Sequence, residues 1–234
     1  MRLPIILIVI AQFLGCTLWF SVNGVSVDLT ARWGLIPSDI GLLTGAVQAG
    51  FIIGTLGLAI SNVADRFAPS HIFLCASVVG CVANLLFAYQ ATGLSEGLIY
   101  RFVVGISLAG IYPIGMKLIV SWSSNLPGVG LGLMVGMLTL GTASPHLFSG
   151  LLLSADWRVT LTLVSTLAMV GGLAVLFIGE GPFGVKQTGT IQWGSVFQSF
   201  KIKRFRASAF GYFGHMWELY AFWTMVPWLV ASAM

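Results

Sequence analysis

The sequence predicts an all-α, polytopic bundle of about seven transmembrane helices. Hydrophobic residues make up 57% of the 234 residues and charged residues only 8%, whereas a soluble domain carries about 25% charged residues. A helix needs about 20 apolar residues to cross a bilayer, and such runs recur at 4–26, 40–60, 71–90, 97–120, 128–153, 159–178 and 207–233. The lipid bilayer is therefore the expected solvent of this chain, and nucleic-acid binding is not expected.

The basic residues are divided unevenly between the two predicted sides. If the N-terminus is cytoplasmic, eight of the 11 basic residues lie inside, namely Arg2, Arg66, Lys117, Lys186, Lys201, Lys203, Arg204 and Arg206. The remaining three lie outside, namely Arg32, Arg101 and Arg158. Positive charge collects on the cytoplasmic side of membrane proteins. The sequence therefore predicts an integral protein of a bacterial inner (plasma) membrane with a cytoplasmic N-terminus, and it explains the net charge of +4 without a charged partner.

Glycines spaced by four residues recur inside the predicted spans. The second run holds Gly41 with Gly45 and Gly50 with Gly54, and the fifth run holds Gly128, Gly132 and Gly136. Small residues at this spacing let two helix backbones approach closely in a membrane. We therefore expect a tightly packed bundle.

Two motifs carry a specific resemblance. The loop after the second run reads SNVADRFAP at 61–69, and the fourth run holds RFVVG at 101–105 followed by GIYP at 110–113. The first resembles the Gly-x-x-x-Asp-Arg-x-Gly loop of the major facilitator superfamily, with Asp65 and Arg66 matching and with Ser61 and Ala68 in place of the glycines. The second resembles the Arg-x-x-x-Gly motif in the fourth helix of the same superfamily.

The resemblance implies an architecture and a mechanism. Members of the superfamily have twelve helices in two parallel halves, with substrate bound at mid-membrane between them and alternating access by rocking. It implies a six-helix half at 1–180, a cytoplasmic linker at 181–206, and the first helix of an incomplete second half at 207–234, so that the chain looks truncated. Asp65 and Arg66 would then form a conformational gate, the simpler alternative being a short solvated turn.

Glu218 is the sharpest candidate for chemistry. It lies in the middle of the seventh run, three residues after His215. An ionisable group at bilayer depth costs roughly 2.5–3.5 kcal/mol on insertion scales and usually faces an interior or a pathway. A carboxyl group among apolar residues and a nearby imidazole are groups that exchange protons near neutral pH. The pair therefore suggests proton coupling, the alternative being a neutral structural glutamic acid.

The other candidate residues are weaker. Arg101 would hold an anionic substrate with its planar fork, or it would reach the membrane interface as a snorkelling side chain. Trp19, Asn23 and Tyr112 could line the same cavity, although aromatic packing is the simpler explanation for each aromatic residue. Arg101 and Lys117 together suggest a small anionic substrate.

The predicted function is secondary active transport of a small solute, coupled to protons, by alternating access. One alternative is a non-transporting fragment or half that must associate with another copy or another half. A drug or metabolite exporter is the other, because Gly141 and Pro145 weakly resemble the fifth helix of proton-coupled exporters. No nucleophile motif, cofactor loop or metal-ligand spacing is present in the sequence, so an enzyme, a cofactor and a metal site are not expected.

Overall fold

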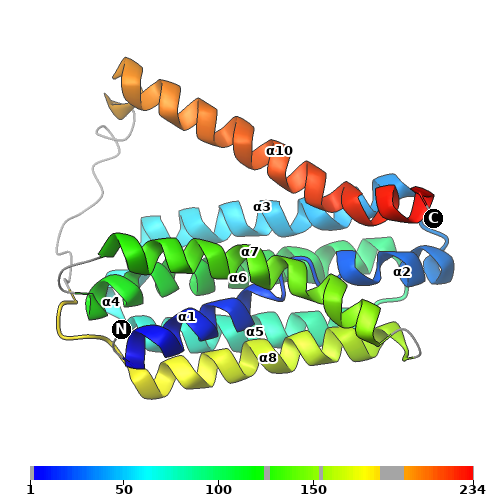
Figure 1. The fold of residues 1–234 in the computed structure, drawn as a ribbon, viewed down its shortest axis with the longest axis horizontal. Coiled ribbons are helices and arrows are strands. Elements are labelled where there is room, and N and C mark those ends of the chain that lie inside the picture. The colour runs from blue at the N-terminus through cyan, green and yellow to red at the C-terminus, as the bar shows by residue number, and fades with distance from the viewer. Residues whose placement is uncertain (1–2, 124–126, 153–154, 185–197, 234) are drawn as a thin grey trace. The chain divides into compact units, whose positions relative to one another are not determined.

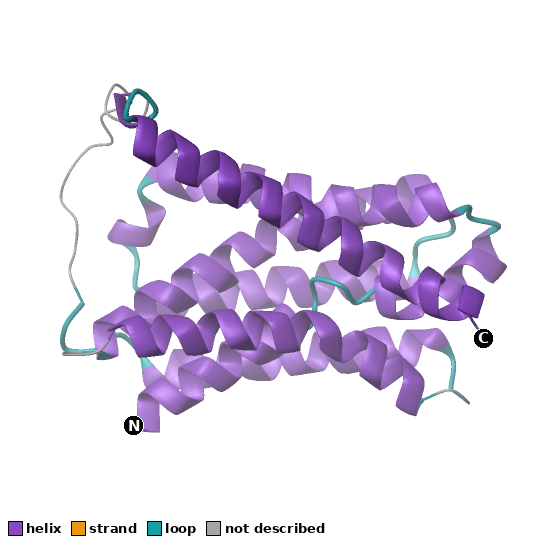
Figure 2. Cartoon of the chain, turned by 45° about the horizontal axis from the view of Figure 1, so that its top comes forward, coloured by secondary structure: helices purple, strands orange, loops and turns teal. Residues whose placement is uncertain are grey.

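The computed structural model describes residues 3–123, 127–152, 155–184 and 198–233, and it divides the chain into two compact units, Met1–Lys186 and Gln187–Met234. The described residues form helices joined by turns and loops, without a strand (Figures 1 and 2). The all-α prediction is thereby confirmed. The helices of the first unit are α1 (Leu3–Cys16), the 3₁₀ helix η1 (Asn23–Val25), α2 (Ser26–Trp33), α3 (Pro37–Ser61), α4 (Val63–Arg66), α5 (Pro69–Tyr89), α6 (Leu94–Trp122), α7 (Pro127–Leu151) and α8 (Trp157–Ile178). The second unit contains α10 (Lys203–Ala233). Much of the expected linker, including Lys186, lies outside the described residues.

Five of the described helices, α3, α5, α6, α7 and α8, are long and apolar enough to cross a membrane. The two other runs expected to span differ for separate reasons. The first is interrupted, so that α1 has only 14 residues. The last forms the 31-residue helix α10, in which polar and ionisable residues such as His215 and Glu218 reduce the apolar character.

The first apolar run is not the continuous helix that 4–26 predicts, because α1 ends at Cys16 and tight turns follow as far as η1. We call residues 17–22 the break. In the break, the Thr17 hydroxyl donates to the Leu14 carbonyl at 2.7 Å and the Ser21 hydroxyl donates to the Leu18 carbonyl at 3.0 Å. Serine and threonine side chains compete with helical backbone bonding in this way. The hydrophobicity of the run predicts a continuous helix and gives no indication of these local hydrogen bonds.

Glycines bring α3 and α6 into backbone contact. A Cβ atom on Gly50 would overlap the Phe102 carbonyl, and one on Gly105 would overlap the Val47 carbonyl. One turn after Gly50, a Cβ on Gly54 would lie 2.8 Å from the Ala109 Cβ. Close packing through Gly50 and Gly54 is therefore present. The fifth-run series behaves differently, since Cβ atoms on Gly128, Gly132 and Gly136 would meet nothing within 4 Å among the described residues.

Helix α6 is the central element of the first unit. It packs against α3 and α5, and also against α1 and α7, while α8 packs against α5 and α1. The consequence is that side chains from α6 can reach the break in the first apolar run from within the bundle.

Candidate functional site

Arg101 projects from α6 into the break. Its side chain is fully buried, and its guanidinium donates to the Trp19 carbonyl at 2.6 Å, the Leu18 carbonyl at 3.3 Å and the Ser21 hydroxyl at 3.0 Å. The last carbonyls of a helix have no partner within the helix, and hydrocarbon offers them none. Arg101 thus satisfies the carbonyls that the break releases, and its side chain does not extend to the surface of the unit.

A second layer of polar side chains supports Arg101. The Asn84 side-chain oxygen of α5 accepts from Arg101 at 3.3 Å and from the Ser21 hydroxyl at 2.9 Å. The Asn84 amide nitrogen in turn donates to the Ser165 hydroxyl of α8 at 3.0 Å. This buried network joins the break to three further helices. Neither Asn84 nor Ser165 is a candidate from the sequence, because single asparagine and serine residues in apolar runs carry no spacing signal.

Beside the break, three of the sequence candidates meet two residues of α3. The Trp19 ring lies 4.8 Å from the Phe51 ring and 6.4 Å from the Tyr112 ring, measured between centroids. The Asn23 amide nitrogen donates to the Thr44 hydroxyl at 2.9 Å. We call these five residues the aromatic–amide cluster. Its members from α3, Phe51 and Thr44, were not singled out by the sequence, although they lie seven residues apart and so share a helix face.

Gln48 extends the polar side of this cluster. It lies on α3 four residues after Thr44 and three before Phe51, so the three side chains share one face. Its side-chain nitrogen is buried and has no hydrogen-bond partner among the described residues. A buried polar group without a partner is unfavourable. Gln48 therefore offers a hydrogen-bonding group to a molecule that reaches the aromatic–amide cluster.

The Asp65–Arg66 loop makes an ion pair with α6. The Lys117 Nζ lies 2.7 Å from the Asp65 carboxylate and also donates to the Ala64 carbonyl. About a quarter of each of the two paired side chains is exposed. The chain turns sharply before this loop, where Asn62 adopts a left-handed conformation with φ of 53°. Arg66 is exposed, and Lys117 is engaged with the loop at the end of α3.

The His215 and Glu218 pair belongs to the second unit. Both residues lie on α10 one turn apart, and both side chains are exposed in this structure. Their spacing places them on the same side of the helix. Within the described residues, no group of three or more histidine, cysteine, aspartate or glutamate side chains is arranged to hold a metal ion.

The chain is similar to a protein family, to a transporter sequence and to a solved transporter structure. The family model described as Major Facilitator Superfamily matches residues 8–234. The niacin transporter NiaP of Acinetobacter baylyi is 26% identical over 165 residues, which is 66% of this chain and 33% of that protein. The crystal structure of a bacterial homologue of the human lysosomal transporter Spinster, inward-facing and unoccupied, superposes with a TM-score of 0.66 at 16% identity.

The alignment with that crystal structure covers 85% of this chain and 48% of the other. This chain therefore spans about a third and about half of the lengths of these two relatives, respectively. Its long apolar helices make it an integral membrane protein. Since the family model covers nearly the whole sequence, the chain belongs to the Major Facilitator Superfamily.

Proposed function

We propose that this chain forms part of a secondary active transporter for a small anionic aromatic acid of the kind represented by niacin, driven by protons through alternating access. The observation that carries the proposal is the aromatic–amide cluster, where Trp19 lies against Phe51 and Tyr112 beside the Asn23–Thr44 hydrogen bond. The similarity of the chain to a niacin transporter supports the substrate class.

The cluster suits a flat ring that carries a polar group. Aromatic side chains stack on planar ligands, and ring pairs contribute about 0.5–1.5 kcal/mol beyond their burial. The side-chain nitrogen of Gln48, buried and without a partner among the described residues, would serve as donor to a ring nitrogen or a carboxylate oxygen. The Arg101 guanidinium donates a hydrogen bond to the Trp19 carbonyl. We propose that Arg101 shapes the cluster and adds positive potential without touching the substrate.

Binding of nicotinate, the anion of niacin, to the purified chain tests this proposal. Trp19→Leu should weaken binding of radiolabelled nicotinate by about 2- to 12-fold, the range that an aromatic pair contributes. Phe177→Leu is a matched control, because Phe177 is 86% exposed on α8. The neutral amide nicotinamide should compete poorly with nicotinate. Equal binding by the wild type and the Trp19 variant would contradict binding at the aromatic–amide cluster. Equal competition by nicotinamide would contradict recognition of the negative charge.

We further propose that the Asp65–Lys117 ion pair is the conformational gate. Asp65→Asn should slow nicotinate exchange across vesicles while leaving its Kd nearly unchanged, because the loop follows the end of α3 at Ser61, about 15 Å along the helix from Phe51 at 1.5 Å per residue. The exchange rate should fall because the substitution removes the ion pair, in which the Lys117 Nζ lies 2.7 Å from the Asp65 carboxylate. The measurement is exchange rate beside equilibrium binding on the same preparation.

The matched control exchanges the two charges. Asp65→Lys combined with Lys117→Asp retains an ion pair and should recover part of the rate that each single change removes. Unchanged exchange in Asp65→Asn would leave the loop as a simple connection.

Association with another copy or another half is also proposed. Trp217 and Phe222 of α10 are 76% and 58% exposed, and exposed aromatic residues of this size are frequent at protein–protein contacts. Such an association would provide the second wall of the substrate pathway. It would also shield Glu218 from hydrocarbon, where an ionisable group is costly.

A further inference from the structure

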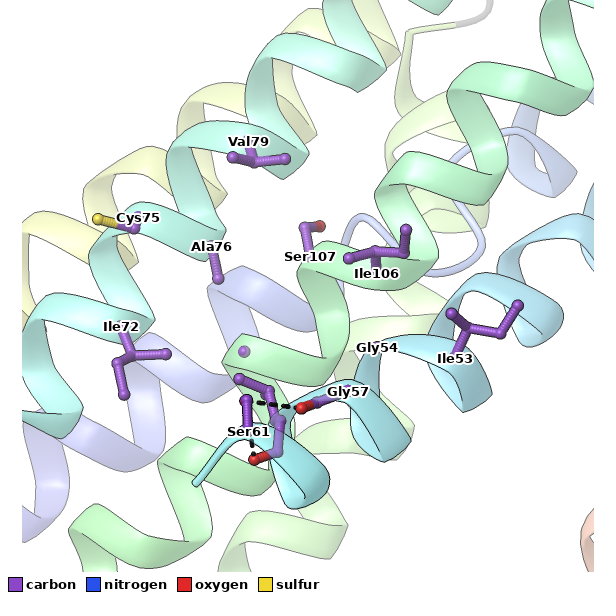
Figure 3. A pocket seen from close by; sticks show the side chains of 12 residues that line it. Ile53, Gly54, Gly57, Ser61, Ile72, Cys75, Ala76, Val79, Ile106 and Ser107 are labelled. Carbon is purple, nitrogen blue, oxygen red and sulfur yellow. Dashed lines mark hydrogen bonds between the residues drawn. The ribbon is translucent and has the colours of Figure 1, made fainter. Parts of the chain in front are cut away.

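A pocket of about 410 Å³ lies between α3, α5 and α6, away from the aromatic–amide cluster. Its walls include Ile53, Gly57 and Ser61 of α3, Cys75 and Val79 of α5, and Ile106 of α6 (Figure 3). The lining side chains are almost entirely hydrocarbon. The pocket therefore suits an apolar group and offers little to a polar solute.

The pocket lies beside the contact between α3 and α6. At Gly54 the two helices touch, since an added Cβ would lie 2.8 Å from the Ala109 Cβ. One turn later, an added Cβ on Gly57 would meet nothing within 4 Å. On the other side, α5 and α6 remain in contact, because a Cβ on Gly110 would lie 2.6 Å from the Ala76 Cβ. Gly57 and Gly110 thus line a groove whose residues come from α3, α5 and α6.

The groove opens onto the apolar outer surface of the first unit. Ile53, Val79 and Ile106 line it, and they are 54%, 45% and 38% exposed. Tyr112 follows Gly110 by two residues, which places it about 200° around α6 at 100° per residue. The groove and the aromatic–amide cluster thus occupy opposite faces of α6. In a membrane, the solvent on the outer face is lipid hydrocarbon.

We propose that this groove binds one acyl chain of a bilayer phospholipid, with the lipid phosphate near Arg66. The groove is continuous with the lipid-facing apolar surface, and Ser61, which lines it, lies two residues before α4. There Asp65 is paired with Lys117, which leaves the exposed Arg66 as the uncompensated positive charge of these three residues. A phosphate group matches that charge, while the acyl chain fills the groove lined by α3, α5 and α6.

Phospholipid retention by the purified full chain tests the proposal. Mass spectrometry of the chain released from detergent should show one retained phospholipid. A Cβ on Gly57 meets nothing within 4 Å, so Gly57→Leu should extend into the groove and lower the retained fraction by roughly tenfold, the effect of withdrawing about two methylene groups from contact. Gly41→Leu is the matched control on α3, since its Cβ also meets nothing within 4 Å and Gly41 does not line the groove.

Cys75 provides a second measurement in a bilayer. It lines the groove and is exposed, whereas Cys16 and Cys81 are buried. A fluorophore on Cys75 in dioleoylphosphatidylcholine vesicles should be quenched by brominated acyl chains, and Gly57→Leu should reduce that quenching. A fluorophore on Val82→Cys in a Cys75→Ser background, seven residues along α5, should be quenched equally with and without Gly57→Leu.

The test of the acyl-chain site can fail independently of the test of nicotinate binding. Equal retention by the wild type, Gly57→Leu and Gly41→Leu, or equal quenching at Cys75 in both backgrounds, overturns the acyl-chain site. Loss of retention in Arg66→Gln supports the phosphate contact, and unchanged retention removes it. Nicotinate binding by Gly57→Leu should equal that of the wild type, because the groove and the cluster lie on opposite faces of α6.

Discussion

Replacing Arg101 with lysine should lower the free energy of unfolding of the bundle by about 1.5–3 kcal/mol, the value of one hydrogen bond to a charged group. The guanidinium reaches two carbonyls, a hydroxyl and an amide oxygen together. An ammonium group has no planar fork and cannot maintain all four contacts. A denaturation series in detergent measures this loss, and nicotinate binding should weaken in parallel because the Trp19 backbone is no longer held.

Arg158→Lys is the matched control for Arg101→Lys. The Arg158 guanidinium also binds a carbonyl, that of Ala88 at 2.8 Å, but a quarter of its side chain is exposed. Exposed ion pairs and hydrogen bonds contribute little, so this variant should unfold at nearly the wild-type denaturant concentration. Equal stability of the two variants would show that the fork at the break has no structural importance.

Replacing Glu218 with glutamine should abolish uphill, proton-driven accumulation of nicotinate. Glutamine keeps the size and the hydrogen-bonding capacity of protonated glutamic acid but cannot ionise. Exchange of nicotinate for nicotinate needs no net proton movement and should survive. Uptake and exchange in vesicles, measured across a range of pH, distinguish the two processes. His215→Ala should shift the pH at which uptake is greatest, because the imidazole is one turn from the carboxyl group.

Glu180→Gln is the control for a general loss of negative charge, since Glu180 follows α8 outside its helical span. It should accumulate nicotinate like the wild type. If Glu218→Gln also accumulates nicotinate fully under a proton gradient, Glu218 has a structural role and the proton-coupling proposal fails.

Sequence periodicity and composition predicted much of the fold. The run 71–90 corresponds to α5 at Pro69–Tyr89, and the run 159–178 corresponds to α8 at Trp157–Ile178. These segments are predictable because continuous hydrophobicity of the required length has few other structural solutions. The break after Cys16 was missed because Thr17 and Ser21 are compatible with a helix, and their bonding to carbonyls depends on local geometry.

The site was less predictable for a tertiary reason. Sequence position places Arg101 near a helix end but does not say which neighbour its side chain faces. The sequence therefore allows both snorkelling and a buried role, and the packing of α6 against the break buries the side chain. Trp19, Asn23 and Tyr112 were candidates individually, whereas Thr44, Gln48 and Phe51 become visible only when α3 lies beside them.

The dependence of the break on Arg101 has a consequence for biosynthesis. Leu18 and Arg101 are 83 residues apart, and at 5–20 residues per second the ribosome needs about 4–17 s to make the intervening chain. During this interval the carbonyls of the break must be bound by water or by the insertion machinery, because hydrocarbon provides no donor. The first apolar segment therefore completes its integration together with α6, and a ribosome arrested before Arg101 should leave a cysteine at Asn23 open to a water-soluble thiol reagent.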